Sequence, residues 1–333
     1  MTEETTKILV TGACGQIGTE LVPELRRRYG RENVLAADIR EPREPLASSG
    51  PFVLADVTDR AGLARLIERH KIGTVYHLAA ILSAKGEQDP QRAWIVNVEG
   101  LRNILELARA YGLRLFWPSS IAVFGPATPK ENVPQETILC PTTIYGITKV
   151  AGELLCDYYF HRFGVDVRGL RYPGIISSEA LPGGGTTDYA VEIFHAAVKE
   201  GRYTCFVRED TVLPMMFMPD AIRAAIELME APLAWLKHHA NYNIAAMSFS
   251  AGELAAEIKR HIPEFICEFE PDPRQAIADS WPRTIDDTAA REEWGWRPRY
   301  DLKAMVEAML KRLSERYALM PRVRAEARGE GEH

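Results

Sequence analysis

The stretch KILVTGACGQIGTEL, residues 7–21, decides the fold. An apolar run ends in a glycine, two more glycines follow at intervals of three, and helical spacing begins directly afterwards. A strand that turns through Gly12, Gly15 and Gly18 into a helix offers free N–H groups and a positive dipole end to a pyrophosphate. The stretch therefore predicts a dinucleotide-binding turn, with Gln16 and Ile17 between its glycines.

Strand and helix patterns alternate after this turn. Strand-like runs are expected at 7–12, 33–38, 52–57, 73–80, 113–120 and 166–174, and helical patterns at 17–30, 58–70, about 89–111 and 144–163. Such alternation predicts right-handed βαβ units and a parallel sheet covered on both faces. The expected fold class is α/β, a Rossmann-type doubly wound parallel sheet with a smaller C-terminal α/β substrate-binding lobe.

The alternation loosens after residue 174. Residues 177–189 read as a long glycine-rich connection that can order over a substrate as a lid. Helical patterns return at 188–200, 219–230, 250–261 and 302–317. The expected domains are a nucleotide-binding domain over 1–172, to which later segments return, a mainly substrate-binding lobe over 173–320 and a polar tail over 321–333.

Composition excludes several classes of function. The 333 residues carry a formal charge of −6, which argues against a nucleic-acid-binding surface. No apolar run approaches the length of a membrane span, so no membrane partner is expected. The five cysteines have no metal-ligand spacing, so no metal is expected either. Reduced cysteines and an acidic N-terminus without signal-peptide character lead us to expect a cytoplasmic protein.

The cofactor is predicted from Asp38, twenty residues after Gly18 at the end of the second strand. A carboxylate there accepts hydrogen bonds from ribose hydroxyls and repels a 2′-phosphate, which selects NAD over NADP. Arg40 is the opposing feature, because an arginine there can accommodate that phosphate. Asp56 can bound the adenine or cap the next helix. Further cofactor contacts are expected at Val57, Leu78, Ala79 and Ala80.

Tyr145 and Lys149 share one face at the start of the 144–163 helix. Ser119 and Ser120 end the fifth strand, whose carboxyl end borders the same crevice. Oxidation of a secondary alcohol needs a base for the hydroxyl proton as the hydride leaves. A tyrosine can be that base if a lysine ammonium and a positive nicotinamide ring stabilise its phenolate. Lys149 can also bind the nicotinamide ribose.

TGACGQIG, Asp38, the strand-end serines, YGITK and LRYPGII occur here in the order found in the extended short-chain dehydrogenase/reductases, which the chain resembles. The resemblance implies that Ser120, Tyr145 and Lys149 are catalytic, with Ser119 facing the substrate. It also implies a proton relay through Asn97, water and the lysine backbone. Cofactor contacts are implied for Tyr172, Pro173 and Ile175.

Longer segments narrow this resemblance. Residues 116–155, 171–194, 213–224 and 275–296 are similar to the short-chain type of L-threonine 3-dehydrogenase, and the similarity runs from about Lys7 to Tyr317. It implies NAD-dependent oxidation of L-threonine at its 3-hydroxyl to L-2-amino-3-oxobutyrate. That product loses CO₂ to give aminoacetone, or a CoA-dependent ligase cleaves it to glycine and acetyl-CoA.

Candidate substrate contacts lie in the second half of the chain. The run GGGTTDY offers backbone N–H groups and hydroxyls at a helix start, which suits a carboxylate. A hinge, a helix cap and a core tryptophan are the alternative structural roles for these residues. Trp281 is expected to exclude water from the pocket. The expected substrate contacts are Ser83, Ser119, Ser120, Tyr145, Gly184, Gly185, Thr186, Thr187 and Trp281, with Asp188 and Asp279 as candidates for the ammonium.

Two other functions stay open. A nucleotide-sugar epimerase or dehydratase needs basic residues for a second pyrophosphate, and Lys199, Arg202, Arg208 and Arg283 are available. A non-catalytic NAD-sensing protein is the more distant alternative, because such relatives tend to lose the tyrosine or lysine that this chain keeps. The 144–163 helix is apolar on more than one face, and the family resemblance implies that it pairs with its twin in a homodimer. The alternative is a helix enclosed within the monomer.

Overall fold

A seven-stranded parallel sheet forms the centre of the larger lobe. The computed structural model describes residues 7–180, 183 and 185–319. The strand order is β10-β6-β5-β4-β1-β2-β3, so the predicted Rossmann-type doubly wound α/β fold is confirmed. The strands are β1 (Lys7–Thr11), β2 (Val34–Asp38), β3 (Phe52–Leu54), β4 (Ile72–His77), β5 (Arg114–Ser120), β6 (Val167–Tyr172) and β10 (Tyr242–Asn243).

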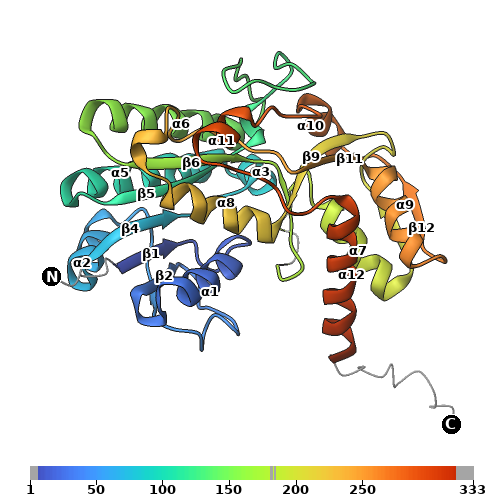
Figure 1. Cartoon of the computed structure of the whole chain (residues 1–333), viewed down its shortest axis with the longest axis horizontal. Coiled ribbons are helices and arrows are strands. Elements are labelled where there is room, and N and C mark those ends of the chain that lie inside the picture. Colours follow the sequence, from blue (N-terminus) through green and yellow to red (C-terminus); the bar gives the residue numbers. More distant parts are fainter. Residues whose placement is uncertain (1–6, 181–182, 184, 320–333) are drawn as a thin grey trace, which may run out of the picture.

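Helices cover both faces of this sheet (Figure 1). Apolar side chains of α1 (Gly18–Tyr29) and α8 (Met218–Glu230) form a buried cluster on one face. Those of α2 (Arg60–His70), α5 (Gly100–Tyr111) and α6 (Ile144–Phe163) form another on the opposite face. Because both faces are buried, β1 carries a continuous apolar run rather than an alternating one.

The strand order reverses between β1 and β4, which opens a crevice at their carboxyl ends. Thr11 and His77 are paired at this end, and Thr11 Oγ1 lies 2.8 Å from His77 Nδ1. Burial, reinforced by the charge of Lys149, lowers the pKa of His77 to about 3. The floor of the crevice therefore holds a neutral imidazole.

The described part of the smaller lobe contains five short strands that sequence patterns did not locate. β7 (Gly174–Ile176), β9 (Val212–Phe217) and β11 (Met247–Ser250) form one sheet, and β8 (Arg202–Cys205) pairs with β12 (Ile266–Phe269). Around them, on the right of Figure 1, lie α7 (Tyr189–Glu200), α9 (Ala251–His261) and α12 (Leu302–Leu319). The limits of these helices agree with the predicted ones to within two residues. The buried cluster of this lobe includes residues 121–124, which directly follow β5. Its core therefore reaches the carboxyl edge of the large sheet.

Later parts of the chain lie against the larger lobe. β10 pairs with β6, α8 packs on α1, and α11 (Thr288–Glu293) contacts β10, whereas α10 (Arg274–Ser280) belongs to the smaller lobe. The domain boundary after residue 172 stays a prediction, and the expected polar tail over 321–333 lies outside the described residues. Among the described helices, none combines the length and apolar character needed to cross a membrane.

Candidate active site

The glycine turn between β1 and α1 is tightly packed on one side and open on the other. Gly12 has a φ of 71°, and a Cβ there would lie 2.6 Å from the Ala79 backbone nitrogen. A Cβ on Gly18 would lie 2.6 Å from the Gly12 carbonyl oxygen. On Gly15 its only near neighbour would be that same oxygen, at 3.1 Å. Gly12 and Gly18 therefore shape the turn, and Gly15 leaves room for a ligand.

The first turn of α1 suits an anion. Its N-cap residue is Ile17, whose side chain cannot accept a hydrogen bond from the free N–H groups. Thr19 and Glu20 donate their N–H groups to the Gly15 and Ile17 carbonyls at 3.0 and 3.2 Å, so a phosphate would meet the helix dipole and the N–H groups of the turn before Thr19. Gln16, between the glycines, donates from Nε2 to the Ile175 carbonyl at 3.4 Å. The turn thus contacts β7 of the smaller lobe, which contains the predicted cofactor residue Ile175, and Pro173, another predicted cofactor residue, lies between β6 and β7.

Asp38 ends β2 beside the glycine turn, with only 6% of its surface exposed. Its Oδ2 accepts the Cys14 N–H at 2.9 Å, and its Oδ1 accepts the Arg40 N–H and Nε at 3.0 and 3.3 Å. Arg40 also donates to the Cys14 carbonyl at 3.0 Å. The guanidinium is therefore turned back onto Asp38, while Oδ2 retains a lone pair for a ribose hydroxyl.

Asp56 follows β3 and does not cap the next helix. Its Oδ1 accepts the N–H and hydroxyl of Thr58 at 2.9 and 2.8 Å, whereas Asp59 caps α2 by accepting the Gly62 N–H. The helix-cap alternative for Asp56 is therefore wrong. The neighbouring Val57 is buried, and its carbonyl accepts from Asn103 at 3.1 Å.

Ser120, Tyr145 and Lys149 meet at the carboxyl end of β5. Ser120 begins the 3₁₀ turn η3 (Ile121–Val123), with its hydroxyl accepting the Ala122 N–H at 3.2 Å. Burial raises the pKa of Tyr145 to about 12, and a hydrogen bond with Ser120 opposes this shift. Burial lowers the pKa of Lys149 to about 7. Its Nζ donates to the Pro118 carbonyl at 2.6 Å and lies 5.6 Å from the Tyr145 ring centroid.

The start of α6 is built to bring Tyr145 close to Ser120. Thr143 caps the helix through the Gly146 N–H at 3.1 Å, and Glu87 of α3 (Ser83–Gln88) accepts the Ile144 N–H at 2.8 Å. A Cβ on Gly146 would lie 2.2 Å from the Ala122 carbonyl oxygen. Only glycine therefore lets the helix approach the turn that follows Ser120.

Asn97 ties the catalytic helix to the end of β4. It lies in the π-helical turn η2 (Ile95–Glu99), between α4 (Pro90–Trp94) and α5, and such widened turns frequently occur at functional sites. Its amide exchanges two hydrogen bonds with the Ile81 backbone and donates to Thr148 Oγ1 at 3.0 Å. Thr148 in turn donates to the Tyr145 carbonyl at 2.8 Å. The proton-relay role of Asn97 stays a prediction.

Comparison with known proteins now identifies the family. The sequence model of the NAD dependent epimerase/dehydratase family matches residues 8–245. The chain belongs to this family. A Staphylococcus haemolyticus protein named as an uncharacterized epimerase/dehydratase is 54% identical over 312 residues, which cover 93% of this chain and 98% of that protein.

Solved structures resemble this epimerase/dehydratase-family chain closely. The holo form of a GalE-like L-threonine dehydrogenase from Cupriavidus necator is 55% identical, with a TM-score of 0.90 and coverage of 92% and 99% of the two chains. The L-threonine dehydrogenase of Phytophthora infestans is 51% identical, with a TM-score of 0.91 and coverage of 93% and 100%. A monomeric L-threonine 3-dehydrogenase from a metagenome database is 54% identical, with a TM-score of 0.89 and coverage of 92% and 99%.

The protein is therefore an NAD-dependent oxidoreductase enzyme, and its own residues fit the cofactor. The open side of Gly15 and the α1 N-terminus suit the pyrophosphate, and Asp38 suits the adenosine ribose. Two exposed apolar residues that sequence reasoning missed flank Asp38. They are Ile39, 64% exposed, and Leu54, 53% exposed and paired with Asp38 across β2 and β3. The isoleucine directly after the strand-end carboxylate is the sequence signal that could have indicated them.

The remaining predicted cofactor residues lie along the same crevice. Leu78, Ala79 and Ala80 follow β4 and are half-buried. Tyr172 ends β6, and its buried hydroxyl donates to the Ala221 carbonyl of α8 at 2.7 Å. The phenol therefore points into the core, and Tyr172 can meet the cofactor only through its backbone or ring edge.

Ser119 does not occupy the place predicted for it. It is 2% exposed and donates to Glu153 Oε1 at 2.5 Å. Successive strand residues point to opposite faces, so Ser119 and Ser120 cannot both face the substrate. The prediction that Ser119 contacts substrate is not supported by this geometry.

The other predicted substrate residues have mixed placements. Ser83, Thr186 and Trp281 are buried, at 8%, 3% and 7% exposure, and Thr187 is half-buried. The Gly185 N–H donates to Asp188 Oδ2 at 2.7 Å, so this donor for a substrate carboxylate is already engaged. Asp279 is paired with Arg208 at 2.8 Å. Gly184 lies outside the described residues. The substrate roles of this set stay predictions.

Proposed function

We propose that the protein oxidises L-threonine at its 3-hydroxyl to L-2-amino-3-oxobutyrate, with NAD as the acceptor. The observation that carries this proposal is the meeting of Ser120, Tyr145 and Lys149 at the carboxyl end of β5. The choice of substrate is supported by sequence identity of 51–55%, over nearly the whole chain, to proteins named L-threonine dehydrogenases.

Each residue of the group has one task in the reaction. Ser120 holds the substrate hydroxyl in line with Tyr145. Tyr145 must lose its own proton to act as the base, and the Lys149 ammonium together with the positive nicotinamide ring of bound NAD would lower its pKa for that purpose. The phenolate then takes the hydroxyl proton. NAD held in the crevice would supply the acceptor for the hydride of the carbon that bears this hydroxyl, so that the alcohol becomes a ketone. Asn97 then supports the passage of the proton to solvent through water and the Lys149 backbone.

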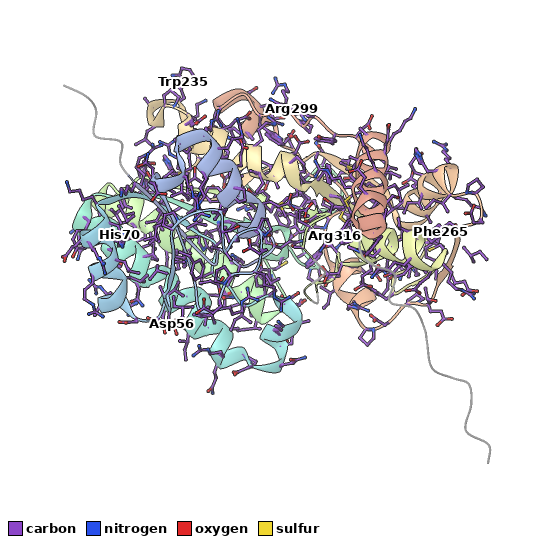
Figure 2. The ribbon with its side chains drawn as sticks, turned by 90° about the horizontal axis from the view of Figure 1, so that it is seen from below. Asp56, His70, Trp235, Phe265, Arg299 and Arg316 are labelled. Atoms are coloured by element: carbon purple, nitrogen blue, oxygen red, sulfur yellow. The ribbon has the colours of Figure 1, made fainter. Side chains whose placement is uncertain are left out.

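The substrate is held by the smaller lobe and by the segment after β4. Ser83, Thr186 and Thr187 bind its polar groups, and Trp281 closes the pocket against water. Arg316 of α12, labelled in Figure 2, ties the segment that follows β7 to α12 by donating to the Ser178 and Glu179 carbonyls at 3.0 and 3.1 Å.

The product gives the enzyme its place in threonine catabolism. A 3-oxo acid loses CO₂ readily, which yields aminoacetone, and a 2-amino-3-oxobutyrate CoA ligase would instead direct it to glycine and acetyl-CoA. We place this activity in the cytoplasm.

A substrate panel tests the proposal. NADH formation is measured with L-threonine, L-allo-threonine, L-serine, UDP-glucose and UDP-galactose, each with NAD and with NADP. Turnover of L-threonine with NAD, well above the other amino acids, is the expected result. No NADH formation with L-threonine, together with activity on a UDP-sugar, would contradict the proposal and favour a nucleotide-sugar epimerase or dehydratase.

We also propose a homodimer through α6. Large apolar residues lie exposed along one side of this helix: Ile147 at 43%, Leu154 at 64% and Tyr158 at 54%. Trp94 and Ile95, at 40% and 42%, continue the patch on the adjoining α4–η2 segment. A face of this size favours burial against a second copy.

Sedimentation velocity tests the dimer. We expect a dimer for the wild type and a folded monomer for the Leu154→Glu/Tyr158→Glu variant, because two buried charges destabilise the interface. A wild-type monomer, as in the metagenome relative, would contradict the proposal.

A further inference from the structure

A buried ion pair lies one helical turn beyond the catalytic lysine. Glu153 of α6 and Arg171 of β6 are 2% and 3% exposed. Arg171 Nε and Nη2 donate to the two Glu153 carboxylate oxygens at 2.9 and 2.8 Å. The Ser119 hydroxyl adds a third hydrogen bond to this carboxylate, at 2.5 Å. Glu153 thus links α6 to β6 and to the end of β5.

Arg171 extends this contact around the segment that carries Ser120. Its Nη1 donates to the Gln135 carbonyl at 3.0 Å and to Asn243 Oδ1 of β10 at 3.2 Å. Its guanidinium lies 5.6 Å from the Phe124 ring centroid. Phe124 directly follows the turn that Ser120 begins. The Glu153–Arg171 pair therefore contacts Ser119, directly before Ser120, and Phe124, directly after the turn that Ser120 begins.

Stability alone does not account for such a pair. Removing two charges from water costs several kcal/mol per ion, and well-packed apolar residues in their place are often as stable or more stable. Here each carboxylate oxygen and each guanidinium nitrogen has a hydrogen-bond partner at the edge of the catalytic group. This placement indicates a role in the reaction.

We propose that Glu153 is a positioning residue, which aligns the Ser120 hydroxyl through Ser119 and supplies the buried negative charge that keeps Lys149 an ammonium. The inference rests on the proposed oxidation of L-threonine. Glu153 acts through other residues and does not touch the substrate. Arg171 is its counter-ion, which makes burial of the carboxylate tolerable.

The groups around Lys149 single out Glu153 as the source of negative charge. His77, from β4, is neutral because burial lowers its pKa to about 3. Cys156, on α6, stays a thiol because burial raises its pKa well above the ordinary value. Tyr145 is a phenol whose pKa burial raises to about 12. Charges at Cys156 and at Glu153 would both oppose the burial that lowers the pKa of Lys149, and because Cys156 stays a thiol, Glu153 is the one of the two that carries the charge.

Glu153→Gln is the first test. It keeps the side-chain size and an acceptor for Ser119, but it removes the charge and leaves Arg171 uncompensated. Lys149 then loses its proton at lower pH. We expect kcat for L-threonine within about threefold of wild type near pH 6 and about tenfold lower at about pH 8 and above, since a nearby charge moves a pKa by about one unit or more. A deficit that is the same at every pH would indicate a merely structural role and overturn the charge assignment.

Two further variants guard against loss of folding. Glu153→Leu/Arg171→Met replaces the pair by apolar residues, so thermal unfolding is expected near the wild-type temperature. It should lose about tenfold in kcat near pH 6, because Ser119 loses its acceptor, and about 100-fold at about pH 8 and above, because the charge is lost as well. Ser119→Ala removes one hydroxyl and should lower kcat by about tenfold at every pH while the KM for NAD is unchanged. Wild-type kcat in both variants would overturn the proposal.

A titration without substrate separates this inference from the proposed function. The side-chain nitrogen of Lys149 is followed by NMR, with its signal assigned by its loss in Lys149→Met. The Lys149 pKa is expected about one unit lower in Glu153→Gln than in the wild type. An unchanged pKa would refute the inference even if L-threonine is the substrate. A lowered pKa with no L-threonine oxidation by the wild type would refute only the proposed function.

Discussion

Gly146→Ala is predicted to separate the catalytic tyrosine from its serine while leaving the cofactor site intact. The added Cβ would lie 2.2 Å from the Ala122 carbonyl oxygen and 2.5 Å from Pro141 Cβ. An ordinary contact is at least 3.4 Å, so α6 and the turn after Ser120 must move apart by about 1.2 Å. A displacement of about 1 Å can cost about 100-fold in rate. Overpacking should also lower the free energy of unfolding by about 1–3 kcal/mol.

The assay compares kcat for the proposed oxidation of L-threonine, NADH binding by fluorescence and thermal unfolding. We expect kcat about 100-fold lower and NADH affinity within about threefold of wild type, because the Gly12–Gly18 turn is untouched. Gly86→Ala is the matched control, since its Cβ would lie 3.1 Å from a methyl group of Ile144, which can yield, and 3.5 Å from Ala93 Cβ, which is an ordinary contact. A Gly146→Ala enzyme with wild-type kcat would refute the reasoning.

Two other substitutions probe the crevice. Asp38→Ser frees Arg40 and removes the ribose acceptor, so kcat/KM with NAD should fall by about 10- to 100-fold and activity with NADP should rise; an unchanged ratio of the two cofactors would contradict the assignment of Asp38. His77 stays neutral in the folded state at pH values where the unfolded chain binds a proton, so folding stability is lost as pH falls from about 6.5 towards about 3, by about 1.4 kcal/mol per pH unit. In His77→Leu, the free energy of unfolding, measured with denaturant at several pH values, should depend on pH less steeply by that amount over this range. An unchanged pH dependence would show that His77 is not the group responsible.

Most of the larger lobe could be predicted because its signals are local. The 144–163 helix has the predicted limits, since Thr143 caps its start and Gly164, with a φ of 69°, ends it. The parallel strands follow from short apolar runs between helices. The glycine turn and Asp38 likewise lie where their spacing predicts, because one strand and one helix fix both.

The smaller lobe was harder to predict because its strands depend on distant partners. β9 is the central strand of its sheet although it contains Pro214, a residue that argues against a central strand. Pro214 lies opposite Ser248 of β11, whereas β7 pairs only with Met215–Phe217, so the proline has a partner strand on one side alone. Because β9 is short and contains a proline, its sequence pattern does not predict a strand.

The sequence predicts which residues belong to the site better than it predicts where their side chains point. Ser119 and Ser120 were both assigned to the substrate, although the period of two in a strand already separates them. Glu153 lies four residues after Lys149, the same spacing that selected Tyr145, yet its importance depends on Arg171, which is distant in sequence. The π-turn at Asn97 has no local signal that we recognised.

The most direct test of the central claim is the rate of NADH formation from L-threonine by wild-type enzyme and by Tyr145→Phe, with NADH binding measured in parallel. The account predicts steady turnover by the wild type, a loss of at least about 100-fold in kcat for the variant, and similar NADH affinity for both. A Tyr145→Phe enzyme that binds NADH normally and oxidises L-threonine at the wild-type rate would contradict the assignment of Tyr145 as the base.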